Sequence, residues 1–162
     1  IDTILGAKSA ASAASLRAGK PELAVQMQAY YDAVFIPAPD SARQLSPSER
    51  CLIAIRTASH SRSAPIVDWY EARARESGAE ETSIAKAKMV SDPWNGDRRS
   101  TAIMRHVDLI VTRPVDSSQE DMSALLDAGL TPGGIVALSQ VVAYVSYQIR
   151  LIATLRALGE NA

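Results

Sequence analysis

The amino-acid sequence predicts an all-α protein, a bundle of about seven helices that forms a single domain over residues 1–162. Three observations predict this fold class. Apolar residues recur at helical spacing in one segment after another, prolines and glycines separate these segments, and none of them has the alternation of a convincing strand. A chain of this length buries roughly 70% of the surface that its unfolded form exposes, so one core needs no covalent crosslink.

Two helices are expected in the first third of the chain. The first has Pro21 in its opening turn and ends before Pro37, because its apolar residues keep helical spacing up to that point. The second begins at Ser46, which has Glu49 three residues later in the arrangement of a capping box. The apolar run 51–55 that follows could form a short strand, but the cap before it and the continuation after it favour a buried helix.

The middle of the chain is expected to hold two further helices. One covers about residues 64–77, after a serine-rich break, and ends at Gly78, which suits a left-handed helix cap. A shorter helix covers residues 80–90. The segment 92–97 contains Pro, Asn and Gly and predicts a loop.

Three helices are expected in the last third. The charged pair Arg98–Arg99 suggests a solvated helix start, and the apolar spacing of residues 103–111 continues that helix up to a proline. A serine at 117 or 118 caps the next helix, which ends at Gly129. The last helix covers about residues 131–158, and its apolar arc is too broad for one buried face. We therefore expect it to be covered on several sides.

Composition excludes several classes of function. Hydrophobic residues make up 47% of the chain and charged residues 22%, and 17 Lys and Arg against 18 Asp and Glu give a net charge of -1. No basic block is present, so we expect no nucleic-acid partner. The single cysteine excludes an intrachain disulfide and a zinc site built on paired thiolates. We expect neither a metal nor a cofactor.

The location of the protein is expected to be cytoplasmic. Residues 1–19 lack the charged head and uninterrupted apolar run of a secretory signal. The longest uncharged segment, residues 135–149, is shorter than the about 20 mostly apolar residues that cross a bilayer. No membrane partner is expected.

Two segments resemble a known superfamily. Residues 45–78, LSPSERCLIAIRTASHSRSAPIVDWYEARARESG, resemble the central helix pair of the carboxymuconolactone decarboxylase and alkylhydroperoxidase D (AhpD) superfamily. In that pair, an acidic residue on the first helix precedes C-x-x-C-x-x-x-H on the second. Residues 107–155 resemble the C-terminal half of its peroxidase-related branch, through Thr112, Pro114, Ala128, Gly129, Tyr144, Tyr147 and Arg150. The resemblance implies an AhpD-like bundle and an oxidoreductase, either peroxidase-like and antioxidant or carboxymuconolactone decarboxylase-like.

The chain departs from the superfamily at its redox motif. With Gly78 placed on the glycine that closes the family's second helix, the two cysteine positions fall on Ser63 and Ile66, and the histidine position falls on Tyr70. The acid position falls on Cys51, or on Glu49 if the interhelical loop differs by two residues. A dithiol peroxidase needs one thiolate to attack and a second to resolve the sulfenic acid, so one cysteine cannot complete this cycle.

Five side chains are candidates for a rebuilt catalytic pocket: Cys51, Glu49, His60, Tyr70 and Ser63. Each also has a structural interpretation, which we prefer. Cys51 lies in an apolar run, where burial raises the pKa of a thiol and makes it inert. Glu49 completes a capping box, His60 suits a loop or the surface, and Tyr70 suits the core with its hydroxyl satisfied. The Ser63 hydroxyl is too weakly acidic to replace a thiol without an activating base.

The last helix predicts self-association. Five residues broaden its apolar arc beyond one face: Val136, Val141, Tyr144, Tyr147 and Leu151. In a monomer they would form an exposed apolar patch unless other helices of the same chain cover them. Members of the superfamily are commonly dimers, trimers or hexamers, so we expect a homo-oligomer that associates through this helix.

Two classes of function stay open at the level of sequence. The first is an oxidoreductase-like enzyme with a rebuilt pocket lined by Cys51, His60, Ser63 and Tyr70, which includes a single-cysteine mechanism through Cys51 and an external thiol. The second is a non-catalytic protein that keeps the helical shell for small-molecule binding or assembly. The residues themselves identify neither a substrate nor an electron donor.

Overall fold

The computed structural model describes residues 2–5, 10, 14, 18 and 20–160. Its elements are α1 (Asp2–Leu5), α3 (Pro21–Phe35), α4 (Pro39–Gln44), α5 (Pro47–His60), α6 (Ala64–Glu76), α7 (Glu81–Lys88), α8 (Arg98–Thr112), the 3-10 turn η1 (Pro114–Asp116), α9 (Gln119–Asp127) and α10 (Pro132–Glu160). The part of the chain that is described contains no strand, and each of the expected helices is present. The prediction of an all-α bundle is therefore confirmed.

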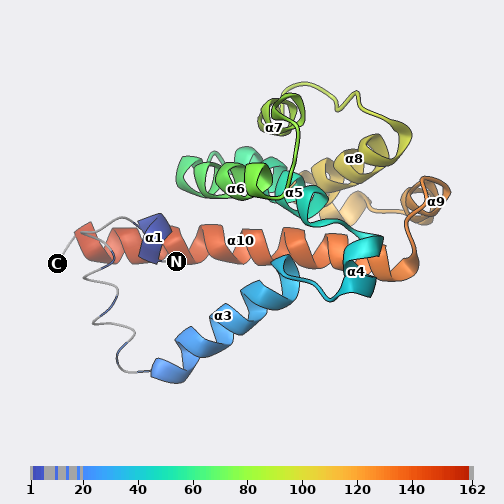
Figure 1. Ribbon diagram of the computed structural model, residues 1–162. Helices are drawn as coiled ribbons and strands as arrows, with labels where there is room; N and C mark the ends of the chain where they lie inside the picture. The colour runs from blue at the N-terminus through green and yellow to red at the C-terminus, as the bar shows by residue number, and fades with distance from the viewer. Residues whose placement is uncertain (1, 6–9, 11–13, 15–17, 19, 161–162) are drawn as a thin grey trace.

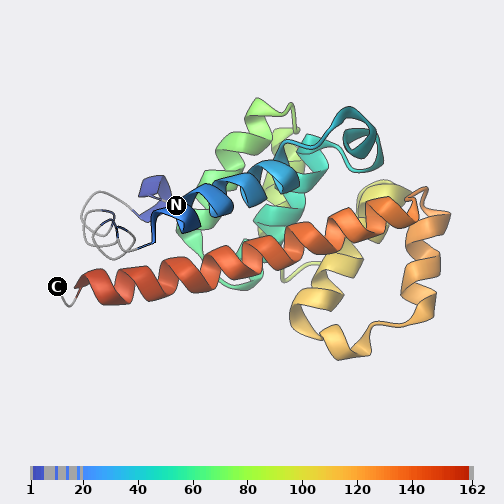
Figure 2. The ribbon, with the colours of Figure 1, turned by 90° about the horizontal axis from the view of Figure 1, so that it is seen from below.

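The long helix α10 organises the bundle. It crosses the middle of the molecule, with α3 on one side and α5 and α6 on the other (Figure 1). Helix α3 meets α10 near the C-terminal end of α3 and slants away from it (Figure 1), while the view from below shows α8 and α9 near the beginning of α10 (Figure 2). Helix α5 is in turn packed against α6, α7, α8 and α10, so it lies at the centre of the fold.

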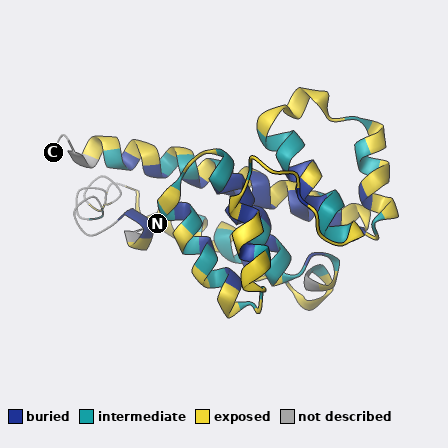
Figure 3. Cartoon of the chain, turned by 90° about the horizontal axis from the view of Figure 1, so that it is seen from above, coloured by how far each residue is buried: buried dark blue, intermediate teal, exposed yellow. Residues whose placement is uncertain are grey.

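The centre of the hydrophobic core lies between α5 and α10. The α5 residues Ile53, Ala54 and Ile55 are fully buried, and Leu138 and Val145 of α10 are buried with them. Colouring by burial shows the most buried segments inside the bundle and the exposed residues on its outer helices (Figure 3). Burial of each large apolar side chain stabilises the fold by about 1.5–3 kcal/mol, so this core holds α5 firmly in place.

Local capping explains where several helices begin. Ser46 accepts a hydrogen bond from the backbone of Glu49, and the Glu49 side chain accepts one from the backbone of Ser46, which is the predicted capping box. Ser118, rather than Ser117, makes the equivalent box with Asp121 at the start of α9. Such caps are each worth about 1 kcal/mol, and they depend only on neighbouring residues.

The structure differs from the sequence-based expectations in several helices. Helix α4 was not expected, because the prolines at 37 and 39 suggested only the end of α3; Pro39 instead occupies the first turn of α4. Helix α5 continues to His60, into the serine-rich segment that was expected to be a break, and α7 is shorter than expected at both ends. These differences leave the order and type of the expected helices unchanged.

The apolar arc of α10 is partly covered within the chain. Val141 is 0% exposed and Tyr144 is 3% exposed, so the expectation that both belong to an exposed surplus is wrong. Helices α3 and α5, which pack against α10, provide this cover. Val136 and Tyr147 stay 57% and 40% exposed.

Helix α10 is also long enough and apolar enough to cross a membrane by length and composition alone. An 18-residue window within residues 132–158 has a mean hydropathy of 1.4, and 44% of that window is buried inside the protein. A core helix packed on several neighbours passes the same test, and α10 contacts α3, α4, α5, α8 and α9. This packing accounts for the buried apolar residues of α10, and Val136 and Tyr147 remain exposed.

Candidate functional site

The turn between α5 and α6 places the positions that resemble the redox motif. Arg62 has a left-handed backbone with φ of 52°, which reverses the chain between the two helices. Ser63 occupies the N-cap position of α6, but its hydroxyl makes no capping hydrogen bond. Ile66 and Tyr70 follow on the inner face of α6 and are fully buried. Gly78 has φ of 81°, the left-handed conformation that was expected after this helix.

Cys51 lies in the first half of α5 and is 6% exposed. Burial raises the pKa of its thiol to about 11, although Ser77 and the Arg73 guanidinium favour the thiolate in part. The thiol is therefore neutral near pH 7. This result agrees with the structural interpretation of Cys51.

Tyr70 lies in the core beside Cys51, and its phenol is the donor of a 2.6 Å hydrogen bond to Oε1 of buried Gln148. Its ring packs against Phe35 with 4.8 Å between ring centroids. Burial raises the pKa of Tyr70 well above its ordinary value, so the phenol keeps its proton. The expectation of a core tyrosine with a satisfied hydroxyl agrees with these contacts.

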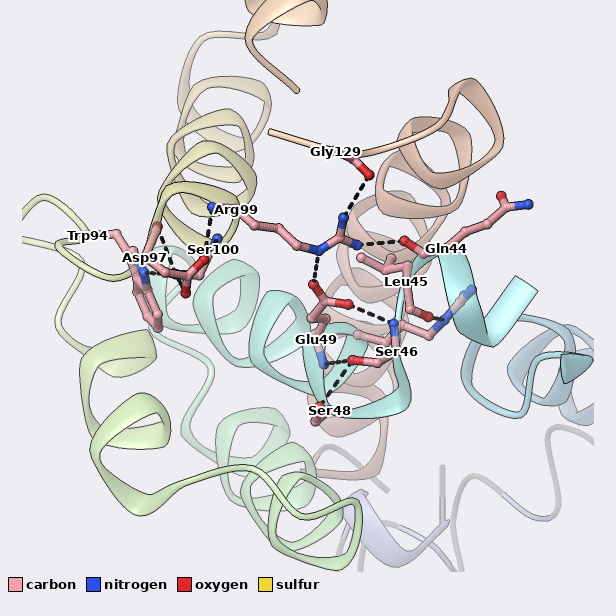
Figure 4. Close-up of polar contacts among 11 residues, drawn as sticks. Gln44, Leu45, Ser46, Ser48, Glu49, Trp94, Asp97, Arg99, Ser100 and Gly129 are labelled. Carbon is pink, nitrogen blue, oxygen red and sulfur yellow. Dashed lines mark hydrogen bonds and ion pairs between the residues drawn. The ribbon is translucent and has the colours of Figure 1, made fainter. Parts of the chain in front are cut away.

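Glu49 is occupied by structural contacts at the N-terminus of α5 (Figure 4). Its Oε2 accepts a 2.8 Å hydrogen bond from the backbone of Ser46, and its Oε1 pairs with Nε of Arg99 at 2.7 Å. The same guanidinium donates to the carbonyls of Gln44 and Gly129. Arg99 thus joins the ends of α4 and α9 to the start of α5, and Glu49 is committed to this junction.

His60 lies at the opposite end of α5. Its Nε2 is 2.7 Å from Oδ1 of Asp108, and Asp108 also makes a bidentate pair with Arg56, at 2.7 Å for each contact. Arg56 is 1% exposed and donates further hydrogen bonds to backbone carbonyls of the segment 86–92. This cluster fastens the end of α7 and the loop after it to α5.

The five predicted site residues therefore do not converge. Cys51 and Tyr70 are neighbours, whereas Glu49 and His60 lie at opposite ends of α5. Eleven residues of helix separate these two by about 16 Å. Glu49 and His60 belong to two different ion-pair clusters, and neither is positioned to act on the Cys51 thiol.

A cavity of about 410 Å³ lies between α1, α3, α6 and α10. Neither Cys51 nor Tyr70 is among its lining residues, but Gln148, which accepts from Tyr70, is one of them. The cavity walls include three aromatic side chains, two amides and one cation: Tyr31, Trp69, Tyr144, Gln28, Gln148 and Arg73. The Arg73 guanidinium lies over the Trp69 ring, 3.4 Å from its centroid. This volume falls within the range of about 300–1,000 Å³ that is typical of small-molecule sites.

The sequence contained a signal for this cavity that was not used. Trp69 and Arg73 are four residues apart on one helix, and so are Tyr144 and Gln148. Residues with this spacing lie on the same helical face. Which two faces meet depends on the packing of α6 against α10 across the core, and the sequence alone does not give that.

Two other hollows are smaller. One of about 320 Å³ lies among charged residues of α8, η1 and α9, and one of about 180 Å³ lies beside Arg56 and Trp94. In the described part of the chain, no group of three His, Cys, Asp or Glu side chains is arranged to hold a metal ion. The cavity at Arg73 is thus the most spacious candidate site among these.

Comparisons with known proteins give one informative match. No family model matches the chain, and no curated protein matches it. Its fold is similar to the crystal structure of an uncharacterized peroxidase-related protein from Silicibacter sp. TM1040, with a TM-score of 0.71 and 16% sequence identity. The match covers 80% of this chain and 65% of the other, so this chain spans just under two thirds of that protein's length. The predicted all-helical fold is therefore confirmed, and it is similar to that of a peroxidase-related protein.

Proposed function

We propose that this chain is a peroxidase-related member of the AhpD-like superfamily that has no dithiol redox centre and acts as a small-molecule-binding protein. The observation that carries the proposal is the cavity of about 410 Å³ between α1, α3, α6 and α10. Its walls offer aromatic rings, amides and a guanidinium, and they include none of the positions that resemble the redox motif. The fold shared with a peroxidase-related protein supports the proposed family.

The chemistry of the motif positions supports the absence of dithiol activity. Ser63 and Ile66 provide no thiol, and the sequence has one cysteine. The resolving step of a dithiol peroxidase, in which a second thiolate displaces hydroxide from a sulfenic acid, has no group to perform it. Cys51 itself is buried, and its pKa of about 11 leaves little thiolate to attack a peroxide.

An enzyme with a single thiol is the second candidate function. It is favoured by one observation, the Arg73 guanidinium, which lies close enough to Cys51 to lower the pKa of the thiol in part. Burial has the larger effect and raises that pKa, so this candidate ranks below a binding protein.

Peroxide consumption distinguishes the two candidates. The purified protein is incubated with an alkyl hydroperoxide and a lipoyl or thioredoxin-type donor, and Cys51→Ser is assayed in parallel. We expect both proteins to match the protein-free rate. Turnover of about 1 per second or more that disappears in Cys51→Ser would overturn the proposal and make Cys51 the nucleophile.

We also propose that the chain forms a homo-oligomer, a dimer, trimer or hexamer, through the outer face of α10. Val136, Tyr147 and Leu158 are exposed apolar residues of this helix. Val136 and Tyr147 are eleven residues apart, which is close to three helical turns, so they share a face. Arg150 also lies exposed, where it donates to the backbone of Ser146.

Light scattering behind a sizing column tests this assembly. We expect a multiple of 17.3 kDa that falls to the monomer mass in Tyr147→Glu with helicity retained. Val115→Glu is the control, because Val115 is 92% exposed and lies on η1 rather than on α10. A wild-type mass of one chain at micromolar concentration would contradict the proposal.

A further inference from the structure

The hydrogen bonds of the cavity wall have a defined direction. Oε1 of Gln148 accepts from Tyr70, so the amide nitrogen of Gln148 faces Tyr144, where it is 3.4 Å from the phenol oxygen. Tyr144 is therefore an acceptor toward Gln148. Its own hydroxyl proton has no acceptor in the described part of the chain, which makes Tyr144 a free donor at the cavity.

Trp69 supplies a second donor without a partner. Its Nε1 is buried, and no described residue accepts from it. A buried polar group without a hydrogen bond costs about 1–3 kcal/mol, so native proteins rarely leave one unless something else binds there. Trp69 lines the same cavity as Tyr144. The wall thus includes two donors, the Tyr144 hydroxyl and the Trp69 Nε1–H, for which no described residue is the acceptor.

Arg73 gives this wall a positive charge. Among the described lining residues it is the one side chain with a formal charge, and none of the ion pairs of the described residues includes it. The nearby carboxylates lie outside the lining: Asp32 accepts from Gln28, and Glu76 is exposed. Burial raises the pKa of Tyr31 and that of Tyr144, so both phenols stay neutral near pH 7. No described residue of the wall carries a charge that neutralises Arg73.

We propose that this cavity binds a small organic carboxylate with a planar apolar body, with the carboxylate on Arg73 and the body beside Met27, Tyr31 and Tyr144. The guanidinium fork matches a carboxylate, and its stacking on Trp69 fixes its plane in advance. Because Arg73 covers one face of Trp69, the ligand body packs on the two tyrosines and Met27. This inference rests on the proposed function and specifies its ligand class.

Calorimetric titration with a matched pair of probes tests the ligand class. The probes are 2-naphthoate and its neutral isostere 2-naphthamide, which differ in charge but share one planar body. We expect 2-naphthoate to bind at least about tenfold more tightly than the amide, because a charge-assisted hydrogen bond contributes about that much. Arg73→Met should remove this preference and leave the amide affinity within about twofold of wild type.

Arg75→Met is the matched control, because Arg75 lies on the same helix and pairs with Glu81 at the surface. It should bind both probes like wild type. Tyr144→Phe provides a second, charge-neutral variant and should weaken 2-naphthoate severalfold, which keeps the inference testable if Arg73→Met does not fold. Inorganic phosphate and 2-naphthalenesulfonate separate a carboxylate site from a general anion site.

The outcomes separate three statements: that the cavity binds a small molecule, that the ligand has a planar body, and that the ligand is a carboxylate. Loss of the preference in Arg73→Met alone supports it. Equal binding of 2-naphthoate and 2-naphthamide in every variant overturns the carboxylate class but leaves a small-molecule site, and so the proposed function, in place. Phosphate that binds as tightly as 2-naphthoate overturns the planar body, and sulfonate that binds as tightly overturns the preference for a carboxylate. If neither naphthalene probe binds at millimolar concentration, the inference and the proposed binding function both fail.

Discussion

The phenol of Tyr70 is bonded to the amide oxygen of Gln148 at 2.6 Å, although the two residues are 78 positions apart in the chain. The bond joins α6 to α10 inside the core, at the position where the resembled superfamily has its histidine. The amide nitrogen of Gln148 donates to the phenol oxygen of Tyr144 at 3.4 Å, and Tyr144 lines the cavity. This position therefore links the core to a residue of the candidate site.

Replacement of Tyr70 by Phe should destabilise the protein by about 1–3 kcal/mol, because it leaves the buried Gln148 oxygen without its donor. Urea unfolding followed by circular dichroism measures the change. Tyr147→Phe is the control, since Tyr147 is on the exposed side of α10, and its free energy of unfolding should change by less than about 0.5 kcal/mol. A Tyr70→Phe variant as stable as wild type would show that this hydrogen bond contributes nothing net.

Cys51 should react slowly with alkylating agents in the native state. Its pKa of about 11, against an ordinary value of 9.0, reduces the thiolate fraction near pH 8 about a hundredfold. The rate of iodoacetamide labelling, followed by mass spectrometry, should rise up to about pH 11 and should increase sharply in denaturant. Rapid native labelling with a midpoint below pH 9 contradicts the buried, neutral thiol.

The same pKa shift makes stability depend on pH. A thiol whose pKa is higher in the folded state contributes stability that is complete below its unfolded pKa and is lost as pH rises toward about 11. Wild type should therefore lose more unfolding free energy than Cys51→Ala between pH 9 and pH 11. Tyrosines and lysines titrate in the same pH range, but they contribute equally to the unfolding free energy of both proteins, so their contribution cancels in the comparison.

Asp108→Asn should destabilise the protein by about 3–5 kcal/mol at pH 7, because it leaves the buried Arg56 guanidinium without its carboxylate. Asp116→Asn removes an exposed carboxylate from a surface pair with Arg113 and should cost less than about 1 kcal/mol. Chemical unfolding of both variants gives the two values. Equal effects would mean that the Arg56 pair is no stronger than a surface contact.

The cost of Asp108→Asn should also fall at acid pH. Burial opposes ionisation of Asp108, but the hydrogen bonds from His60 and Arg56 outweigh it and hold the pKa below its ordinary value. A carboxyl group with a depressed folded pKa contributes stability above its unfolded pKa and loses it as pH falls through the folded value. The gap between wild type and Asp108→Asn should therefore narrow below about pH 4. A gap that stays constant down to pH 2.5 would contradict this assignment.

Arg99→Met should destabilise the protein by about 1–2 kcal/mol, since the guanidinium holds Glu49 and two carbonyls at the junction of α4, α5 and α9. Arg98→Met is the control at the neighbouring exposed position and should be close to neutral. Thermal unfolding of the two variants compares them directly. If Arg98→Met costs as much as Arg99→Met, the effect belongs to the helix start and not to the junction.

The order and type of the helices were predictable because their signals are local. A capping box needs only Ser46 and Glu49, and a left-handed cap needs only Gly78, so the sequence carries both in full. The missing redox pair is equally local, because a count of one cysteine does not depend on the fold. Helix α4 was missed because a proline can end one helix or begin the next, and the sequence does not say which.

What the tertiary structure decided is which faces meet. The sequence alone suggests that Val141 and Tyr144 are surplus apolar residues, but in the folded chain both are buried. It likewise suggests that Arg99 is solvated, but in the folded chain Arg99 donates to the carbonyl of Gly129. The alignment of α6 with α10 brings Arg73 and Trp69 to the same cavity as Tyr144. These contacts join residues far apart in the chain, and their energies depend on burial and on the dielectric around each charge. Local spacing carries neither quantity, so only the folded chain could assign these roles.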